Sequence, residues 1–465
     1  MPQSETSLTF VVRRHVPELI APAVSTPREL KPLSDIDDKE GMRHQVSSIH
    51  MYERDPKMGH INPATIIRDA LTKVLVFYYP FAGRLKEGPT RKLMVDCTGE
   101  GVLFIEAEAD VTLKQFGEAL HPPFPCLEEL LYDVPGSSGI IDSPLLLIQV
   151  TRLLCGGFII ASRFNHTMCD GEGFLQFFTA LGEMAQGESI PSTFPVWQRE
   201  LLSARNPPRV TFTHHEYEKP KKTKGNVLTM HDMDTKSFFF GSTELSSIRG
   251  FVPENLKNIS TFEMIAATIW RCRTIALQPD PEAEMRFMFP VNARTKFNPA
   301  LPVGYYGNCF VLACAISTAK DLSHKPLCYA LELVMKAKAL VSEEYVRSMI
   351  DLMDLRGRPM VNLDHAYMMS GVSKSKFDDI DFGWGKASYR GIAKEGLDFL
   401  PGVFNYYIPF KNNKDESEIM VPISLPSAAM DIFVKDLNDI LMSNNDKKTL
   451  KKHKLLVPAG CSSKL

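Results

Sequence analysis

One stretch of strand, loop and helix constrains the fold of this chain more than any other. Residues 158–164 are mostly apolar, which predicts a buried strand, and residues 172–186 carry apolar side chains at helical spacing. Asp170 is placed to cap that helix and Gly187 to end it. His166 therefore lies where a strand stops and a loop begins, a place where folds often present chemistry.

His166 and Asp170 form a His-x-x-x-Asp motif, which is a weak signal by itself because a histidine after a buried strand often only bonds to nearby backbone. A second motif runs Asp381-Phe382-Gly383-Trp384-Gly385. Two glycines around an indole, opened by an acid, predict a tight turn with close backbone approach. A plain surface turn would seldom use one of the only three Trp residues of the chain.

Together, the two motifs resemble those of the plant BAHD family of acyl-CoA-dependent acyltransferases in residue types, order and separation. Alternating strands and helices independently predict an α/β fold. The resemblance implies two chloramphenicol-acetyltransferase-like domains with mixed sheets flanked by helices. It also implies a solvent channel between the domains, with His166 at its middle.

The predicted domains follow the composition along the chain. Residues 1–195 form an N-terminal domain that carries the His-x-x-x-Asp motif. A crossover linker follows at 196–226, where prolines and like-charged lysines oppose a packed element. Residues 227–446 form a C-terminal domain that carries the second motif, and 447–465 form a basic, flexible tail.

Local patterns predict further elements. Ser260 and Glu263 match a capping box that opens a helix. We expect hairpins from strands 93–96 and 102–107 and from strands 404–410 and 418–425. Other predicted strands are 8–12, 45–52, 145–152, 237–244, 287–291 and 310–315, and other predicted helices are 63–78, 264–276, 325–349 and 426–442.

Charge and cysteine usage narrow the class of protein. A net charge of −2 argues against a nucleic-acid partner, and no window approaches the ~20 apolar residues that a membrane span needs. The nine cysteines are odd in number and include no Cys-x-x-Cys pair, so we interpret them as reduced thiols without a metal. We expect a monomer.

The family resemblance implies direct acyl transfer, with His166 as general base and acyl-CoA as co-substrate rather than a permanently bound cofactor. His166 would take the proton of the acceptor hydroxyl as that hydroxyl attacks the thioester. A covalent route through Cys169 is the alternative, but a thiol three residues along the loop need not point at His166. Asp381 would act in support, together with Gly383, Trp384 and Gly385 in the second motif.

Asp170 admits two interpretations. Its carboxylate could orient His166 as in a catalytic triad. The family resemblance instead implies that it points away and pairs with an arginine of the second domain, and Arg294 matches that place. Asn292 stands where the family more often has Asp, which leaves the local pairing around Arg294 open.

Substrate contacts are also implied. The helix that opens at Ser260 offers free N–H groups to a CoA phosphate, and Lys257 lies just before it. By resemblance, Val46, Ser48 and His50 would line the acceptor side of the channel. They could equally be ordinary strand residues.

The motifs Asp35–Asp38, Trp197–Leu201 and Arg205–Arg209 resemble those of the volatile-ester-forming alcohol acyltransferases within the family. Among these, the resemblance favours enzymes that use benzoyl-CoA and benzyl alcohol to make benzyl benzoate. Alternatives are an alcohol acyltransferase that uses acetyl-CoA or another acyl-CoA, an N-acyltransferase, and a binding protein without activity.

The sequence ends in Ser463-Lys464-Leu465, the pattern that a peroxisomal import receptor reads. We therefore expect a peroxisomal protein, with the cytoplasm as the alternative. Plant benzoyl-CoA arises by peroxisomal β-oxidation, so the location fits the expected donor. A role in salicylic acid and defence metabolism would follow from that product.

Overall fold

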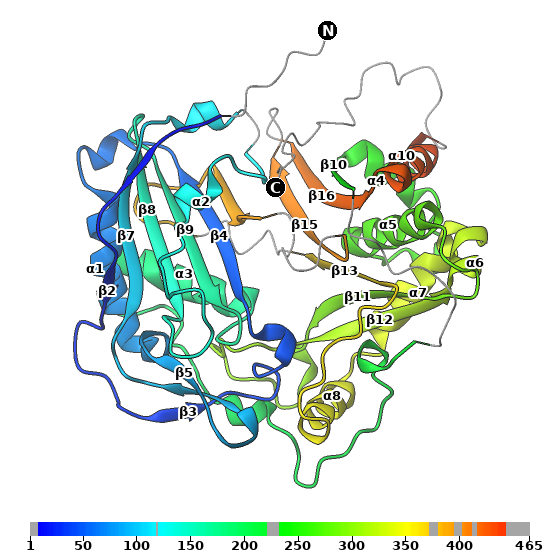
Figure 1. Ribbon diagram of the computed structural model, residues 1–465, viewed down its shortest axis with the longest axis horizontal. Coiled ribbons are helices and arrows are strands. Elements are labelled where there is room, and N and C mark those ends of the chain that lie inside the picture. Colours follow the sequence, from blue (N-terminus) through cyan, green and yellow to red (C-terminus); the bar gives the residue numbers. More distant parts are fainter. Residues whose placement is uncertain are drawn as a thin grey trace.

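The computed structural model describes residues 8–117, 120–220, 232–371, 380–394, 402–411 and 416–442. Two sheet-rich units lie side by side, with helices on their outer sides (Figure 1). This is the mixed α/β arrangement that the sequence predicts. The predicted tail, with Ser463, Lys464 and Leu465, lies outside the described residues.

The first sheet has seven strands within the described residues, and only β7 and β8 pair in parallel. Helices α1 (Pro63–Phe77) and α3 (Gly171–Ala185) pack together beside it. Its strands in spatial order are β1 (Val12–Arg14), β7 (Val102–Ala109), β8 (Leu146–Leu153), β9 (Phe158–Asn165), β4 (Gln45–Tyr52) and β14 (Tyr389–Ile392), and β2 (Glu18–Ile20) also pairs with β7.

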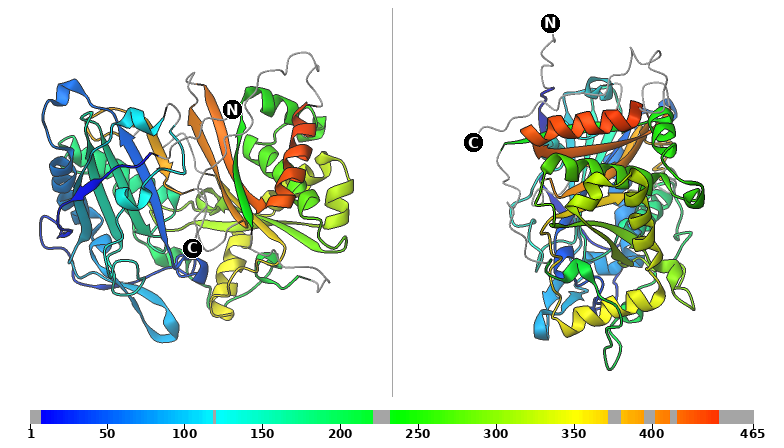
Figure 2. Two further views of the ribbon diagram at one scale, coloured as in Figure 1. Left: turned by 45° about the horizontal axis from the view of Figure 1, so that its top comes forward. Right: turned by 90° about the vertical axis from the view of Figure 1, so that its right-hand side faces the viewer.

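The second sheet has six strands in the part of the chain that is described, and helices cover its outer face, whereas α8 (Glu343–Leu355) lies apart from them (Figure 2). The strand order is β10 (Met233–Phe240), β16 (Ser417–Pro426), β15 (Phe404–Lys411), β13 (Ala366–Gly371), β11 (Glu284–Asn292) and β12 (Phe310–Thr318). The helices are α4 (Ser242–Arg249), α5 (Thr261–Leu277), α6 (Ala319–His324), α7 (Leu327–Ala339), α8 (Glu343–Leu355) and α10 (Ser427–Met442).

The two hydrophobic cores exchange side chains. Ile36 comes from the N-terminal part of the chain but packs in the core of the second unit. Tyr306 comes from the C-terminal part and packs in the core of the first unit, against Tyr78 and Phe81. Each unit therefore completes its core with an aromatic or aliphatic group from the other half of the sequence.

Several local predictions are confirmed. Ser260 and Glu263 form the predicted capping box at the start of α5. Strands β15 and β16 form the predicted antiparallel hairpin. The Asp170 carboxylate accepts the backbone N–H groups of Glu172 and Gly173 and so caps α3. Each of these signals is local, and local hydrogen bonds decide the outcome.

The hairpin predicted from 93–96 and 102–107 is wrong. β6 (Leu93–Asp96) pairs with β3 (Leu30–Pro32) and β5 (Arg84–Glu87) in a separate three-stranded sheet, whereas β7 joins the large sheet. Gly101 explains the divergence because it has a left-handed φ of 104° and lies directly on the Ile20 backbone. The chain is thus turned toward β2 instead of back along β6.

Two further boundaries differ from prediction. The prediction that 325–349 is largely helical is confirmed, but the stretch divides into two helices, because the Ser342 side chain accepts the Tyr345 N–H and starts α8 anew. The strand predicted at 237–244 ends at Phe240, since Glu244 caps the backbone N–H of Gly241 and begins α4.

Strand β14 crosses between the units. It follows the second motif in the chain and pairs antiparallel with β4 at the edge of the first sheet. Ile380, Phe382 and Trp384 pack in the core of the first unit. A contiguous C-terminal domain at 227–446 therefore does not describe residues 380–392. The channel predicted between the units stays a prediction.

Gly173 lies where the two units approach closely, because a Cβ at this position would be 1.9 Å from the Tyr306 carbonyl oxygen. We expect Gly173→Ala to lower the free energy of unfolding by about 1–3 kcal/mol, since the overlapping backbone must move. Gly171→Ala on the same helix is the control, because nothing lies within 4 Å of its Cβ. Chemical denaturation of both variants would measure the difference, and equal stabilities would contradict the close contact.

Candidate functional site

His166 lies directly after β9 and is half-buried. The backbone N–H of His166 donates to the His44 carbonyl at 2.9 Å. The centroids of the His44 and His166 rings lie 5.3 Å apart. Phe164 and Phe310 also face the imidazole, each with ring centroids 6.2 Å away. Nδ1 of His166 has no hydrogen-bond partner among the described residues. The imidazole is therefore positioned mainly by its backbone and by surrounding rings.

Burial decides the charge state of this pair of histidines. Desolvation lowers the pKa of His166 below its ordinary value. Desolvation and the neighbouring His166 also lower the pKa of His44 to about 3. Both rings are consequently neutral at neutral pH, and a neutral imidazole can accept a proton.

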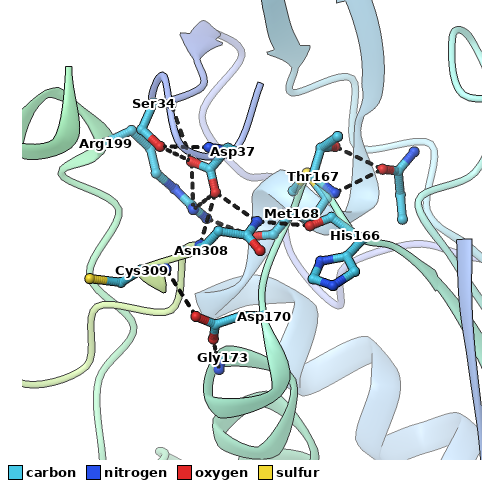
Figure 3. Close-up of polar contacts among 12 residues, drawn as sticks. Ser34, Asp37, His166, Thr167, Met168, Asp170, Gly173, Arg199, Asn308 and Cys309 are labelled. Carbon is cyan, nitrogen blue, oxygen red and sulfur yellow. Dashed lines mark hydrogen bonds and ion pairs between the residues drawn. The ribbon is translucent and has the colours of Figure 1, made fainter. Parts of the chain in front are cut away.

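The predicted Asp170–Arg294 ion pair is confirmed, with two guanidinium bonds of 2.8 and 2.9 Å. The same carboxylate accepts the Cys309 N–H at 2.9 Å and caps α3. Figure 3 shows that it is directed away from the His166 ring, so the geometry does not support a triad. Asn292, the departure from the family pattern, accepts the Arg294 N–H at 3.0 Å and closes that turn.

The electrostatics of this pair are those of a buried, compensated ion pair. Burial opposes the charge of Asp170, but the Arg294 guanidinium and the N–H groups of Cys309 and Gly173 outweigh it and hold the carboxyl pKa below its ordinary value. Arg294 also donates to the Gly307 carbonyl at 2.6 Å. Asp170 therefore joins the loop of residues 166–170 between β9 and α3, called the His loop below, to the second unit.

A second network, centred on Asp37, holds the loop from the other side (Figure 3). Asp37 accepts from Arg199 at 2.9 and 3.0 Å and from the backbone and side chain of Asn308, both at 2.9 Å. Asn308 also donates to the His166 carbonyl at 2.7 Å, and Arg199 donates to the Met168 carbonyl at 2.8 Å. The loop backbone is thus fixed by the linker and the second unit.

Sequence reasoning missed the role of this network. Asp37 and Arg199 lie inside segments that were noticed only for their family resemblance. Both side chains are buried, as is Asn308. The sequence carries no signal for this role, because a charged residue in the linker looks solvated until the fold places it against its carboxylate partner.

Cys169 does not have the environment of a nucleophile. Its side chain is fully buried in the first core. Burial raises the pKa of the thiol well above its ordinary value, and the thiolate is the reactive form. The geometry therefore favours direct transfer over a covalent route.

The second motif lies at the far end of β9 from His166. The Trp384 ring packs edge-on against Phe158, the first residue of that strand, at 5.0 Å. Asp381 accepts the N–H groups of Gly383 and Gly385, at 2.7 and 2.8 Å, where both glycines have left-handed φ angles. Asp381 therefore shapes its own turn, and eight strand residues (about 25 Å) separate this turn from the His loop.

Of the predicted CoA contacts, the Ser260 hydroxyl already donates to Glu263 at 2.6 Å, and the Lys257 ammonium is exposed and paired with Glu254. On the predicted acceptor strand, Ser48 bonds to Ser162 at 2.7 Å, and Val46 packs against the first core. His50 is fully buried and stacks on Phe178 of α3 at 5.2 Å, with neither ring nitrogen bonded within the described residues. These substrate contacts stay predictions.

Within the described residues, no group of three or more His, Cys, Asp or Glu side chains is arranged so that it could hold a metal ion. In the same part of the chain, no helix combines the length and apolar character needed to cross a bilayer.

Asp170→Asn should lower the free energy of unfolding by about 3–5 kcal/mol, because it leaves Arg294 without its partner. The carboxyl pKa is depressed in the folded state, so this stabilisation is present above the unfolded pKa of about 3.9 and disappears as the pH falls through the folded value. The difference between wild type and variant should therefore shrink in acid.

Urea denaturation at pH 7 and pH 3.5 would measure both effects. The control is Glu332→Gln, which removes an exposed ion pair with Lys336 and should cost under about 1 kcal/mol. A folded Asp170→Asn enzyme of unchanged stability that loses only turnover would contradict the structural role.

Comparison with known proteins agrees with this architecture. The Transferase family model matches residues 10–440. The chain is 57% identical over 457 residues to benzyl alcohol O-benzoyltransferase of Petunia hybrida, covering 98% of this chain and 99% of that protein. It is 52% identical to (Z)-3-hexen-1-ol acetyltransferase of Arabidopsis thaliana, covering 95% and 98%.

Solved structures share the fold. Vinorine synthase superposes with a TM-score of 0.69 at 19% identity, over 92% of this chain and 98% of that one. TRI101 of F. graminearum, in complex with coenzyme A and T-2 mycotoxin, superposes with a TM-score of 0.64 at 15% identity, over 87% and 96%. The predicted two-unit α/β fold is confirmed. With a family model and close relatives spanning nearly its whole length, the chain belongs to the Transferase family, the BAHD acyltransferases.

Proposed function

We propose that the chain is an acyl-CoA:alcohol O-acyltransferase that transfers benzoyl from benzoyl-CoA to benzyl alcohol, giving benzyl benzoate and CoA. The observation that carries the reaction type is the half-buried His166, whose Nδ1 has no hydrogen-bond partner within the described residues and whose loop is held by the Asp170 and Asp37 networks. Support for the substrates comes from relatives of Petunia hybrida and Nicotiana tabacum, both benzyl alcohol O-benzoyltransferases, at 57% and 58% identity.

In the proposed mechanism His166 acts as general base. It removes the hydroxyl proton of the alcohol while the oxygen attacks the thioester carbonyl carbon. The resulting tetrahedral intermediate breaks its carbon–sulfur bond, and the proton on the imidazolium passes to the leaving CoA thiolate. The ester and free CoA are released, and His166 returns to its neutral form.

The surrounding contacts suit a base that must be fixed in place yet remain neutral. Both nearby carboxylates, Asp37 and Asp170, have an arginine of their own. Within the described residues, neither carboxylate forms a hydrogen bond with the imidazole, so Asp170 acts on the imidazolium only through its charge. Orientation thus comes from the loop backbone, which reduces the cost of bringing base and acceptor together.

The acceptor and donor contacts are part of the proposal. Val46, Ser48 and His50 follow His44 along β4, and β4 pairs with β9 up to the residue before His166. We assign this strand to the acceptor side. The N-terminus of α5 with Ser260, and nearby Lys257, would face the CoA phosphates.

Replacing His166 with Ala should reduce turnover roughly 10²–10⁴-fold, the usual contribution of a general base. Folding should be unaffected because Nδ1 of the ring has no hydrogen-bond partner within the described residues and the side chain is only half-buried. Steady-state kinetics and a thermal melt would check both points. Unchanged turnover in a folded variant would rule out the mechanism.

The aromatic donor is tested by comparing acyl-CoA substrates. The specificity constant should be about tenfold or more higher for benzoyl-CoA than for acetyl-CoA, because burying a phenyl ring contributes several kcal/mol of binding at ~25 cal/mol per Å². Benzyl alcohol should be preferred over short aliphatic alcohols and over benzylamine. Equal use of acetyl-CoA at matched acceptor concentration would reject the aromatic assignment, and faster use of the amine would favour N-acylation.

We also propose a peroxisomal location, supported by Ser463, Lys464 and Leu465 alone. There the enzyme would meet benzoyl-CoA at its source, on a route toward salicylic acid and defence. The full chain with a fluorescent label at its N-terminus should collect in peroxisomes. Deletion of the last three residues should move the labelled protein to the cytosol without loss of acyltransferase activity. Cytosolic signal from the full chain would reject this location.

A further inference from the structure

Lys39 is a buried lysine beside the His loop whose role is not explained by the fold. Only 5% of its surface is exposed. The ammonium lies 4.4 Å from the centroid of the Phe310 ring, and it donates a long hydrogen bond of 3.5 Å to the Phe310 carbonyl. Within the described residues, no carboxylate oxygen lies within the 4.0 Å of an ion pair. A buried ammonium so weakly compensated is rare in proteins.

Phe310 connects this charge to the candidate active site. Its ring contacts the Lys39 ammonium, and its centroid lies 6.2 Å from that of the His166 ring. The cation and the imidazole therefore share one aromatic neighbour, and both groups are at least partly withdrawn from water. Charges interact more strongly there than across solvent, because the effective dielectric constant is lower.

The neighbouring carboxylates Asp37, Asp170 and Glu216 offset the charge of Lys39 only from a distance, because none of them forms an ion pair with it within the described residues. Asp37 is paired with Arg199, and Asp170 is paired with Arg294. Glu216 is buried and bonds to His214 and Tyr345. The titratable and charged groups that surround Lys39 and His166 are Asp37, His44, Cys169, Asp170, Arg199, Glu216, Arg294 and Cys309.

We propose that Lys39 is a positioning residue that acts on the acyl-transfer reaction through His166. Its buried ammonium, held against Phe310, helps to keep the His166 imidazole in the neutral form that accepts a proton. This inference rests on the proposed role of His166 as general base. It assigns to the segment that follows Asp37 and Asp38 a function in the chemistry as well as in holding the two units together.

The causes that shift the pKa values of His166 and Lys39 act in the direction that the proposal requires. Burial is the main cause that lowers the pKa of His166, Asp170 opposes the shift, and the Lys39 charge adds to it. Burial also lowers the pKa of Lys39 itself to about 8, so the ammonium remains protonated at neutral pH. An imidazolium formed during the reaction next to this cation is a stronger acid, which favours return of the proton to the CoA thiolate.

The test compares Lys39→Met, which removes the charge, with Lys39→Arg, which keeps it. The matched control is Lys336→Met on the exposed face of α7. The specificity constant for benzoyl-CoA transfer is measured from pH 5 to pH 9. The acidic limb of Lys39→Met should move to higher pH by half a unit or more, while the limbs of Lys39→Arg and Lys336→Met coincide with wild type.

An active Lys39→Met enzyme whose acidic limb coincides with wild type would overturn the inference. An equal loss of rate at every pH would also overturn it and indicate a structural role. If the methionine variant does not fold, Lys39→Gln keeps a donor for the Phe310 carbonyl and carries the same comparison. Failure of the general-base mechanism is recognised separately, because the His166→Ala enzyme would then retain its turnover.

Discussion

The buried ion pair between Asp37 and Arg199 is the interaction on which the arrangement of the two units depends. Both side chains are withdrawn from water, so their charges are costly unless each compensates the other. Asn308 of the second unit completes the group by donating twice to the same carboxylate. Three distant parts of the chain must therefore assemble together. A buried pair of this kind adds little net stability, and its value here is that only one docking satisfies every charge.

The His loop takes its shape from that docking. Its carbonyl groups at His166 and Met168 accept hydrogen bonds from Asn308 and Arg199, and its last residue, Asp170, binds Arg294. None of these donors belongs to the strand or the helix that flank the loop. The conformation of the His loop is consequently a property of both units together. Catalytic groups on loops commonly need such support, because the loop backbone has few partners of its own.

Sequence patterns predicted what local hydrogen bonds decide, such as the caps at Asp170 and Ser260. They failed where the partner is distant, as for β6 and β7, since an alternating pattern defines a strand without naming its neighbour. The Asp170–Arg294 pair came from family resemblance, because nothing within either segment reveals the other. Lys39 and Arg199 were hidden for a related reason: charged residues look solvated in a sequence, and only the fold shows that these are buried.

The crossing of β14 has a consequence for biosynthesis. Strand β4 is made early, whereas its outer neighbour is encoded far downstream and follows most of the second unit. During translation the nascent first sheet presents an open edge, with unpaired N–H and C=O groups along β4. Such edges recruit other chains and promote aggregation. Production of soluble enzyme should therefore depend on chaperones that shield this edge, and the N-terminal half expressed alone would keep it exposed permanently.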